Sequence, residues 1–252
     1  MAKKKKEEKP HYNIVYCLPG KKYFDGFHNI WLDSAKAGYK CACVHPPYNA
    51  NVYYARTMCL GNNGISSADI HRPLFESKIT YDYVVWIDDD CVVNFQQIYR
   101  LLKQDVDIVA GLYHMRCKDE FPVVEKENWE YYEKHGSFEF LTDQDVQAYQ
   151  HLVTKNNEKE TDKKKFTDIN GYNIGCSLLP VFYTGFGCMV IKKGVFEKIG
   201  YPYFAPEFFT LLNGVVDFYS EDSSFCVKAK KAGYQVYVDI GVIVGHEKNY
   251  IV

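Results

Sequence analysis

A continuous apolar run that ends in three aspartates constrains this chain most. Residues 83–87 read YVVWI, and Asp88, Asp89 and Asp90 follow directly. A short run of β-branched and aromatic residues without polar alternation is typical of a strand buried on both faces, as in a parallel sheet. Adjacent carboxylates repel one another, so a fold that holds three together needs a compensating partner. A divalent cation is the first candidate.

Strand and helix patterns alternate through about the first 115 residues. The expected strands are 12–17, 41–45, 83–87 and 106–113, and the expected helices begin at residues 27, 52 and 95. We expect the first helix to bury one face that carries Phe27, Ile30, Trp31 and Ala35. This alternation predicts an α/β fold, with a mainly parallel central sheet flanked by helices in a single compact unit.

Beyond residue 115 the alternation is weaker. Residues 155–165, KNNEKETDKKK, predict a mobile, solvated loop. Residues 177–191, SLLPVFYTGFGCMVI, predict two buried strands around a glycine turn rather than a membrane-spanning helix. A last helix is expected to open at Glu221 and to end at Gly233, before a final strand.

The charge and cysteine patterns narrow the class of protein. Residues 1–10, MAKKKKEEKP, predict a disordered charged tail that is not a signal peptide. The formal net charge is -2, which gives no general attraction to nucleic acid. The nine cysteines include no CxxC pair and are expected to be free thiols in a reducing compartment. We therefore expect a cytoplasmic protein without an integral membrane segment and without a nucleic-acid partner.

The aspartates are the main candidate site. Ligands of open α/β sheets bind outside the carboxyl ends of the strands, where these residues lie. In extended geometry, Asp88 and Asp90 project to the same side, as two ligands of one hard cation would. The alternative is that Asp89 or Asp90 caps the next helix. One acid would suffice for a cap, so three in a row favour the metal.

Three residues near the carboxyl terminus are weaker candidates. Glu221 and Asp222 open a predicted helix, where acids also favour the helix dipole without any catalytic role. His246 follows an apolar strand, where it could be structural or could offer a neutral imidazole to a metal.

The order of these features resembles the GT-A glycosyltransferases. An Asp-x-Asp at a strand end is followed by TGFGCMVI and YPYF, an acid pair at a helix start, and a terminal GH. The chain looks most like inverting, family-2-like members of small bacterial or large-virus type. The resemblance covers most of residues 12–248 and is weakest between about 115 and 175.

The resemblance implies a GT-A, Rossmann-like fold and a hexosyl- or pentosyltransferase. It would move a sugar from a nucleotide diphosphate sugar, by default a UDP-sugar, to a glycan or glycoprotein acceptor with inversion. Residues 11–115 would form the nucleotide-sugar half of one domain, and residues 116–252 the acceptor and catalytic half. Such an enzyme would serve bacterial or virus-encoded glycan synthesis in the cytoplasm.

The resemblance also implies roles for single residues. Asp88 and Asp90 would be the Asp-x-Asp pair beside the ribose and a Mn²⁺ or Mg²⁺ ion, and Asp89 is a third acid at the same place. His246 would be a further metal ligand. Asp222 would be the general base, next to Glu221. Contacts to the donor or acceptor would come from Leu18, Pro19, Arg56, Gly185 and Gly187.

Two other functions remain open at this stage. A nucleotidyltransferase also joins an α/β sheet to clustered acids and a metal, and Gly20, Lys21 and Lys22 faintly match its phosphate loop. A non-catalytic nucleotide-sugar or glycan-binding module is the other, because fold alone does not decide function.

Overall fold

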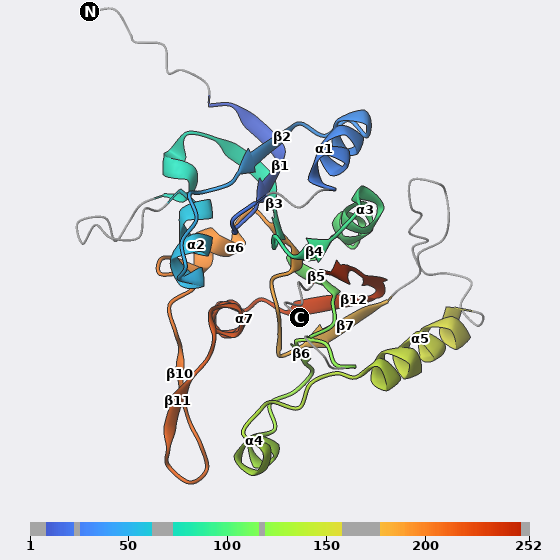
Figure 1. Ribbon diagram of the computed structural model, residues 1–252, viewed down its shortest axis with the longest axis vertical. Helices are drawn as coiled ribbons and strands as arrows, with labels where there is room; N and C mark the ends of the chain where they lie inside the picture. Colours follow the sequence, from blue (N-terminus) through green and yellow to red (C-terminus); the bar gives the residue numbers. More distant parts are fainter. Residues whose placement is uncertain (1–8, 23–25, 62–72, 116–118, 158–176, 248–252) are drawn as a thin grey trace, which may run out of the picture.

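A seven-stranded sheet in the order β2-β1-β3-β9-β5-β12-β7 forms the centre of the protein (Figure 1). The computed structural model describes residues 9–22, 26–61, 73–115, 119–157 and 177–247. The strands are β1 (His11–Cys17), β2 (Cys41–Val44), β3 (Thr80–Ile87), β5 (Ile108–Leu112), β7 (Leu178–Val181), β9 (Cys188–Lys192) and β12 (Val236–Ile243).

Most strands of the sheet point the same way. β1 is parallel to β2 and β3, and β12 is parallel to β5. β9 is antiparallel to both β3 and β5, and β7 is antiparallel to β12. All strands except β7 and β9 therefore share one direction, which confirms the predicted α/β fold with a mainly parallel sheet.

Helices cover both faces of this sheet. In β1, Ile14 and Tyr16 face one layer, and Val15 and Cys17 face the other. The first layer holds α1 (Phe27–Lys36) and α3 (Phe95–Lys103), and the second holds α2 (Val52–Cys59), α6 (Val195–Ile199) and α7 (Glu221–Lys231). The two layers follow from the alternation of side chains along apolar strands.

The buried face of α1 differs from the prediction at one position. Phe27 and Ile30 are buried as expected, but Ala35 is exposed and Ser34 is buried in its place. The Ser34 hydroxyl donates to the Ile30 carbonyl oxygen at 2.7 Å and lies 2.7 Å from the hydroxyl of buried Tyr16. A buried serine is tolerated here because its hydrogen bonds are made.

The second half contains more structure than the sequence predicts. Between residues 119 and 157 the chain forms β6 (Val123–Val124), α4 (Trp129–His135) and α5 (Asp143–Asn157). Residues 155–157 of the predicted mobile loop close α5, and residues 158–165 lie outside the described residues, as do residues 1–8 of the predicted tail. The remaining short elements are a 3-10 turn (Leu74–Ser77), β4 (Cys91–Val92), β8 (Tyr183–Thr184), β10 (Phe208–Thr210), β11 (Val216–Phe218) and β13 (Gly245–His246).

The segment 177–191 forms three strand pieces that do not pair with one another. β7 pairs with β12 at the sheet edge, β8 pairs with β6, and β9 lies between β3 and β5. The prediction of two buried strands around a glycine turn is therefore incomplete. Within the described ranges, no helix has the length and apolar character needed to cross a membrane.

A buried carboxylate ties β12 to the helix layer. Asp239 is fully buried and accepts hydrogen bonds from Arg100 Nε and Nη2, both at 2.8 Å. It also accepts from Gln104 Nε2 at 2.5 Å and from the Ser177 hydroxyl. Such a charge is stable in the interior only while these donors surround it.

We expect Asp239→Ala to lower the free energy of unfolding by about 3 kcal/mol, because it leaves the Arg100 guanidinium without its partner. Urea denaturation followed by circular dichroism measures this loss. The control is Asp33→Ala, which removes a half-exposed pair with Lys36 and should change stability by less than about 0.5 kcal/mol. Equal losses in the two variants would contradict a structural role for the Asp239 network.

Candidate active site

Arg56 links three elements at the carboxyl edge of the sheet. Its Nη1 and Nη2 donate to the two carboxylate oxygens of Asp88, at 2.9 and 3.1 Å, directly after β3. Its Nε donates to Glu221 Oε1, at 3.4 Å, in the first turn of α7. The side chain is only 4% exposed, and its guanidinium lies 4.9 Å from the centre of the Phe186 ring. The fork geometry of arginine thus joins α2, β3 and α7.

Acids outnumber this one buried cation. Burial alone would lower the pKa of Arg56, but Asp88, Glu221 and Asp222 together raise it above its ordinary value. Burial and repulsion by Asp222 raise the pKa of Glu221, although Arg56 opposes that shift. The site is therefore short of positive charge.

His246 forms the second half of the site. Its Nε2 lies 2.9 Å from Asp90 Oδ2, and its Nδ1 lies 2.8 Å from the His114 carbonyl oxygen. β13 pairs with β4 so that His246 stands opposite Cys91, and the backbone N–H of Glu247 donates to the Asp90 carbonyl oxygen at 2.7 Å. The backbone thus holds the imidazole against the aspartate.

The protonation of His246 decides what this pair can do. A carbonyl oxygen only accepts, so Nδ1 carries a proton and donates to His114. Nε2 then faces Asp90 either as the second N–H of an imidazolium or as a lone pair that shares a cation with the carboxylate. A histidine whose other ring nitrogen is fixed by a carbonyl is a common arrangement at metal sites.

The donor set fits a divalent cation with two protein ligands. Asp90 and His246 offer an oxygen and a nitrogen side by side. In the part of the chain that the structure describes, no group of three or more His, Cys, Asp or Glu side chains is arranged to hold a metal. Mg²⁺ and similar ions are often held by one or two protein groups together with waters and substrate phosphates.

The other two aspartates have different partners. Both oxygens of Asp88 are taken by Arg56, so its predicted role as a metal ligand is not what this geometry displays. Asp89 accepts from the Lys21 backbone N–H at 2.8 Å. A Cβ added to Gly20, whose φ is +147°, would lie 2.5 Å from Asp89 Oδ2, so glycine is required for this contact.

The helix-capping alternative for the aspartates is wrong. Asn94 caps α3, since its side chain accepts from the Gln97 N–H while the Gln97 side chain accepts from the Asn94 N–H, both at 3.0 Å. Neither Asp89 nor Asp90 is therefore the N-cap of α3.

Asp222 lies in the first turn of α7. Its Oδ1 accepts from the Ser223 N–H at 2.8 Å and from the Ser220 hydroxyl. Among the described residues, its Oδ2 accepts no hydrogen bond. At this position Asp222 could simply favour the helix dipole. A dipole role alone does not require the contact that neighbouring Glu221 makes with Arg56.

Tyr113 belongs to the site but was not predicted. Its ring stands edge-on to His246, with centres 5.2 Å apart. Burial and the nearby Asp222 and Asp88 raise the pKa of Tyr113 well above its ordinary value, so the hydroxyl stays protonated as a donor. The signal was available, since Tyr113 follows β5 as Asp88 follows β3.

The two predicted glycines make room for this tyrosine. A Cβ on Gly185 would lie 2.0 Å from the Tyr113 hydroxyl, and a Cβ on Gly187 would lie 2.6 Å from the ring. Their small size is thus explained by Tyr113, and their predicted approach to a sugar stays a prediction.

Leu18 and Pro19 lie at the end of β1 as expected. Leu18 is 3% exposed and packs in the α1 and α3 layer, while its carbonyl oxygen lies 2.9 Å from His45 Nδ1. Both side chains are buried, so a contact with a nucleotide base stays a prediction.

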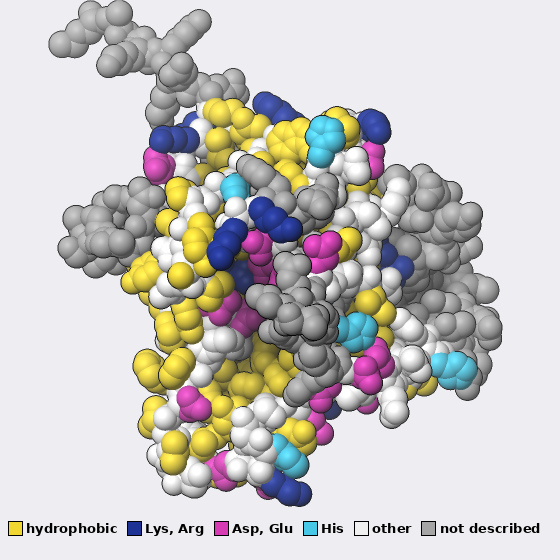
Figure 2. All heavy atoms as spheres, in the orientation of Figure 1, with side chains coloured by type: hydrophobic (Ala, Val, Ile, Leu, Met, Phe, Trp, Pro, Cys, Tyr) yellow, Lys and Arg dark blue, Asp and Glu magenta, His cyan; other side chains and the backbone are white. Residues whose placement is uncertain are grey.

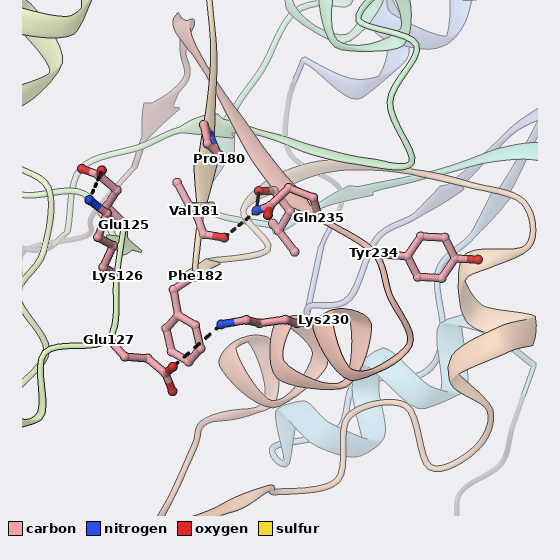
Figure 3. A pocket seen from close by; sticks show the side chains of 10 residues that line it. Glu125, Lys126, Glu127, Pro180, Val181, Phe182, Lys230, Tyr234 and Gln235 are labelled. Carbon is pink, nitrogen blue, oxygen red and sulfur yellow. Dashed lines mark hydrogen bonds and ion pairs between the residues drawn. The ribbon is translucent and has the colours of Figure 1, made fainter.

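Charged side chains of both signs gather on one face of the protein (Figure 2). Figure 2 shows acidic side chains gathered beside Lys and Arg in a recess near the middle of one face. The recess differs from the cavity of Figure 3, of about 420 Å³, in which Lys230 reaches over Phe182 toward Glu127. Lys230 lies in the last turn of α7, whereas Glu221 and Asp222 lie in the first turn. That cavity is therefore not part of the site.

Comparisons with known proteins do not assign a function to this chain. No protein-family model and no curated protein matches the sequence. Among solved structures, the chain is similar to one titled "Crystal Structure of A197 from STIV", with 13% identity and a TM-score of 0.45. The match covers 95% of this chain and 96% of that chain. A likeness this low carries no argument about activity.

The raised pKa of Glu221 gives a pH-dependent prediction. The folded state holds the Glu221 proton more tightly than the unfolded state, so the free energy of unfolding falls as pH rises above the unfolded pKa, about 4.3. We expect Glu221→Gln to be more stable than the native chain at pH 7 and to lose this advantage near pH 4.

Urea denaturation at both pH values measures this difference. The matched control is Glu130→Gln, at an exposed position in the first turn of α4, which should not reproduce the gain. A Glu221→Gln protein that is less stable than the native chain at pH 7 would mean that the attraction to Arg56 dominates instead.

Proposed function

We propose that the protein is a metal-dependent GT-A glycosyltransferase that moves a sugar from a nucleotide diphosphate sugar to an acceptor hydroxyl with inversion. The observation that carries the proposal is the bridge from Asp88 through Arg56 to Glu221. It brings the acid pair of α7 to the strand end that bears the aspartates. A UDP-sugar is the default donor, and a glycan or glycoprotein is the proposed acceptor.

The proposed transfer needs one base and one leaving-group site. As the acceptor oxygen bonds to the anomeric carbon, Asp222 takes the acceptor's hydroxyl proton, and the bond from that carbon to the phosphate oxygen breaks. The nucleoside diphosphate leaves with the electron pair. Attack from the face opposite the leaving group inverts the anomeric carbon, as in inverting hydrolases with an acceptor in place of water.

The charges of the site suit this reaction. Asp90 and His246 would hold Mn²⁺ or Mg²⁺. Such an ion neutralises the charge that develops on a diphosphate leaving group. Arg56 holds Asp88 in place on the donor side, and burial beside Asp222 and Asp88 keeps the Tyr113 hydroxyl protonated. Each of these groups has a defined position before substrate binds.

Two substitutions separate the proposed roles. Asp222→Asn should lower transfer by roughly 10²–10⁴-fold, because the base is lost, while donor binding measured by calorimetry stays close to native. Asp90→Asn should weaken the Mn²⁺-dependent part of UDP binding as well as transfer.

The control for both is Asp33→Asn on α1, which should keep native binding and turnover. Native transfer by Asp222→Asn would exclude it as the base. Native Mn²⁺-dependent UDP binding by Asp90→Asn would exclude the proposed metal ligand. Release of pyrophosphate from a nucleoside triphosphate would instead indicate a nucleotidyltransferase.

A further inference from the structure

The hairpin of β10 and β11 carries an apolar surface outside the site. It projects from the body of the protein, at the lower left of Figure 1. Phe208 pairs with Phe218 and Thr210 pairs with Val216 on its outer side. The exposed fractions are 71% for Phe208, 66% for Leu212, 62% for Val216, and 55% for both Val215 and Phe218. Side chains this apolar are seldom left so exposed together.

The inner side of the hairpin is fixed to α4. Phe209 stacks on Trp129, with ring centres 4.9 Å apart, and Asp217 accepts from the Tyr132 hydroxyl at 3.0 Å. At the turn, the Asn213 N–H donates to Glu133 Oε1 at 2.8 Å. The contacts on the inner side leave the outer apolar side chains pointing away from the protein.

Charge argues for a lipid occupant. Residues 208–216 contain no Lys, Arg, Asp or Glu, and the one acid of β11, Asp217, is turned toward Tyr132. A protein partner would be expected to meet a polar rim that sets its orientation. An uncharged aromatic and aliphatic edge instead matches the boundary between lipid headgroups and acyl chains.

Size and shape argue against a second copy of the chain. The five side chains expose on the order of 500 Å² of apolar surface, below the roughly 800 Å² per partner of a stable protein interface. The hairpin is a projecting ridge, and a lipid surface adapts to such a shape without a matching groove.

We propose that the β10–β11 hairpin inserts its outer side into the surface of a lipid bilayer. Only Tyr219 and Ser220 separate β11 from α7, and Tyr219 is buried against Phe209, with ring centres 4.6 Å apart. A hairpin lying in lipid therefore holds Glu221 and Asp222 close to the membrane surface. The proposal does not depend on the transferase activity.

Flotation with phosphatidylcholine vesicles tests this proposal. Zwitterionic lipid is the right probe because the hairpin carries no cation. This lipid also offers no anionic surface to the lysines at the amino terminus. The native chain is expected to float with the vesicles. The double variant Leu212→Ser, Val216→Ser should bind the vesicles at least about tenfold more weakly than the native chain.

The matched control is Leu152→Ser on α5, whose leucine is 54% exposed, and it should partition like the native chain. Leu212→Trp gives a second readout, a blue shift of emission and quenching by brominated acyl chains. No binding by the native chain, or equal binding by the serine variant, would overturn the proposal. A dimer in sedimentation that the serine variant dissociates would assign the surface to a second copy instead.

Discussion

The buried guanidinium of Arg56 is the interaction on which the site depends. Taking such a charge out of water is costly, and the bidentate pair with Asp88 offsets most of that cost. Asp88 comes from the end of β3 and Glu221 from the start of α7, so the pairing fixes a strand end against a helix start 133 residues away in the chain. The Phe186 ring packs against the same guanidinium.

The surrounding acids then remain partly uncompensated. One arginine faces Asp88, Glu221 and Asp222, and burial together with repulsion from Asp222 raises the pKa of Glu221. A divalent cation at Asp90 and His246, with a diphosphate beside it, would turn this excess of negative charge into a binding site.

The sheet could be predicted because its signals are local. The apolar run 83–87 predicts β3, and the rule that ligands bind at strand ends makes Asp88 to Asp90 the candidate site. The same rule could have found Tyr113. Its relation to Gly185 and Gly187 could not be predicted, because it depends on the packing of β5 against the loop before β9.

Other features of the structure cannot be predicted from a sequence pattern. Ser34 is buried because the Tyr16 hydroxyl meets it, whereas helical periodicity favoured Ala35. Asn213 and Gly214 between two apolar runs are a hairpin signal. The outward exposure of Phe208 and Phe218 is a tertiary property, since an apolar strand pattern ordinarily predicts burial.

The most direct measurement of the central claim is nucleoside diphosphate release from a panel of nucleotide sugars, with Mn²⁺ or with a chelator. We expect at least one donor, with UDP-sugars the first to try, to be slowly hydrolysed or transferred in Mn²⁺ and to be inert with chelator. Turnover that is unchanged by the chelator, or no release and no binding of any donor in Mn²⁺, would contradict this expectation.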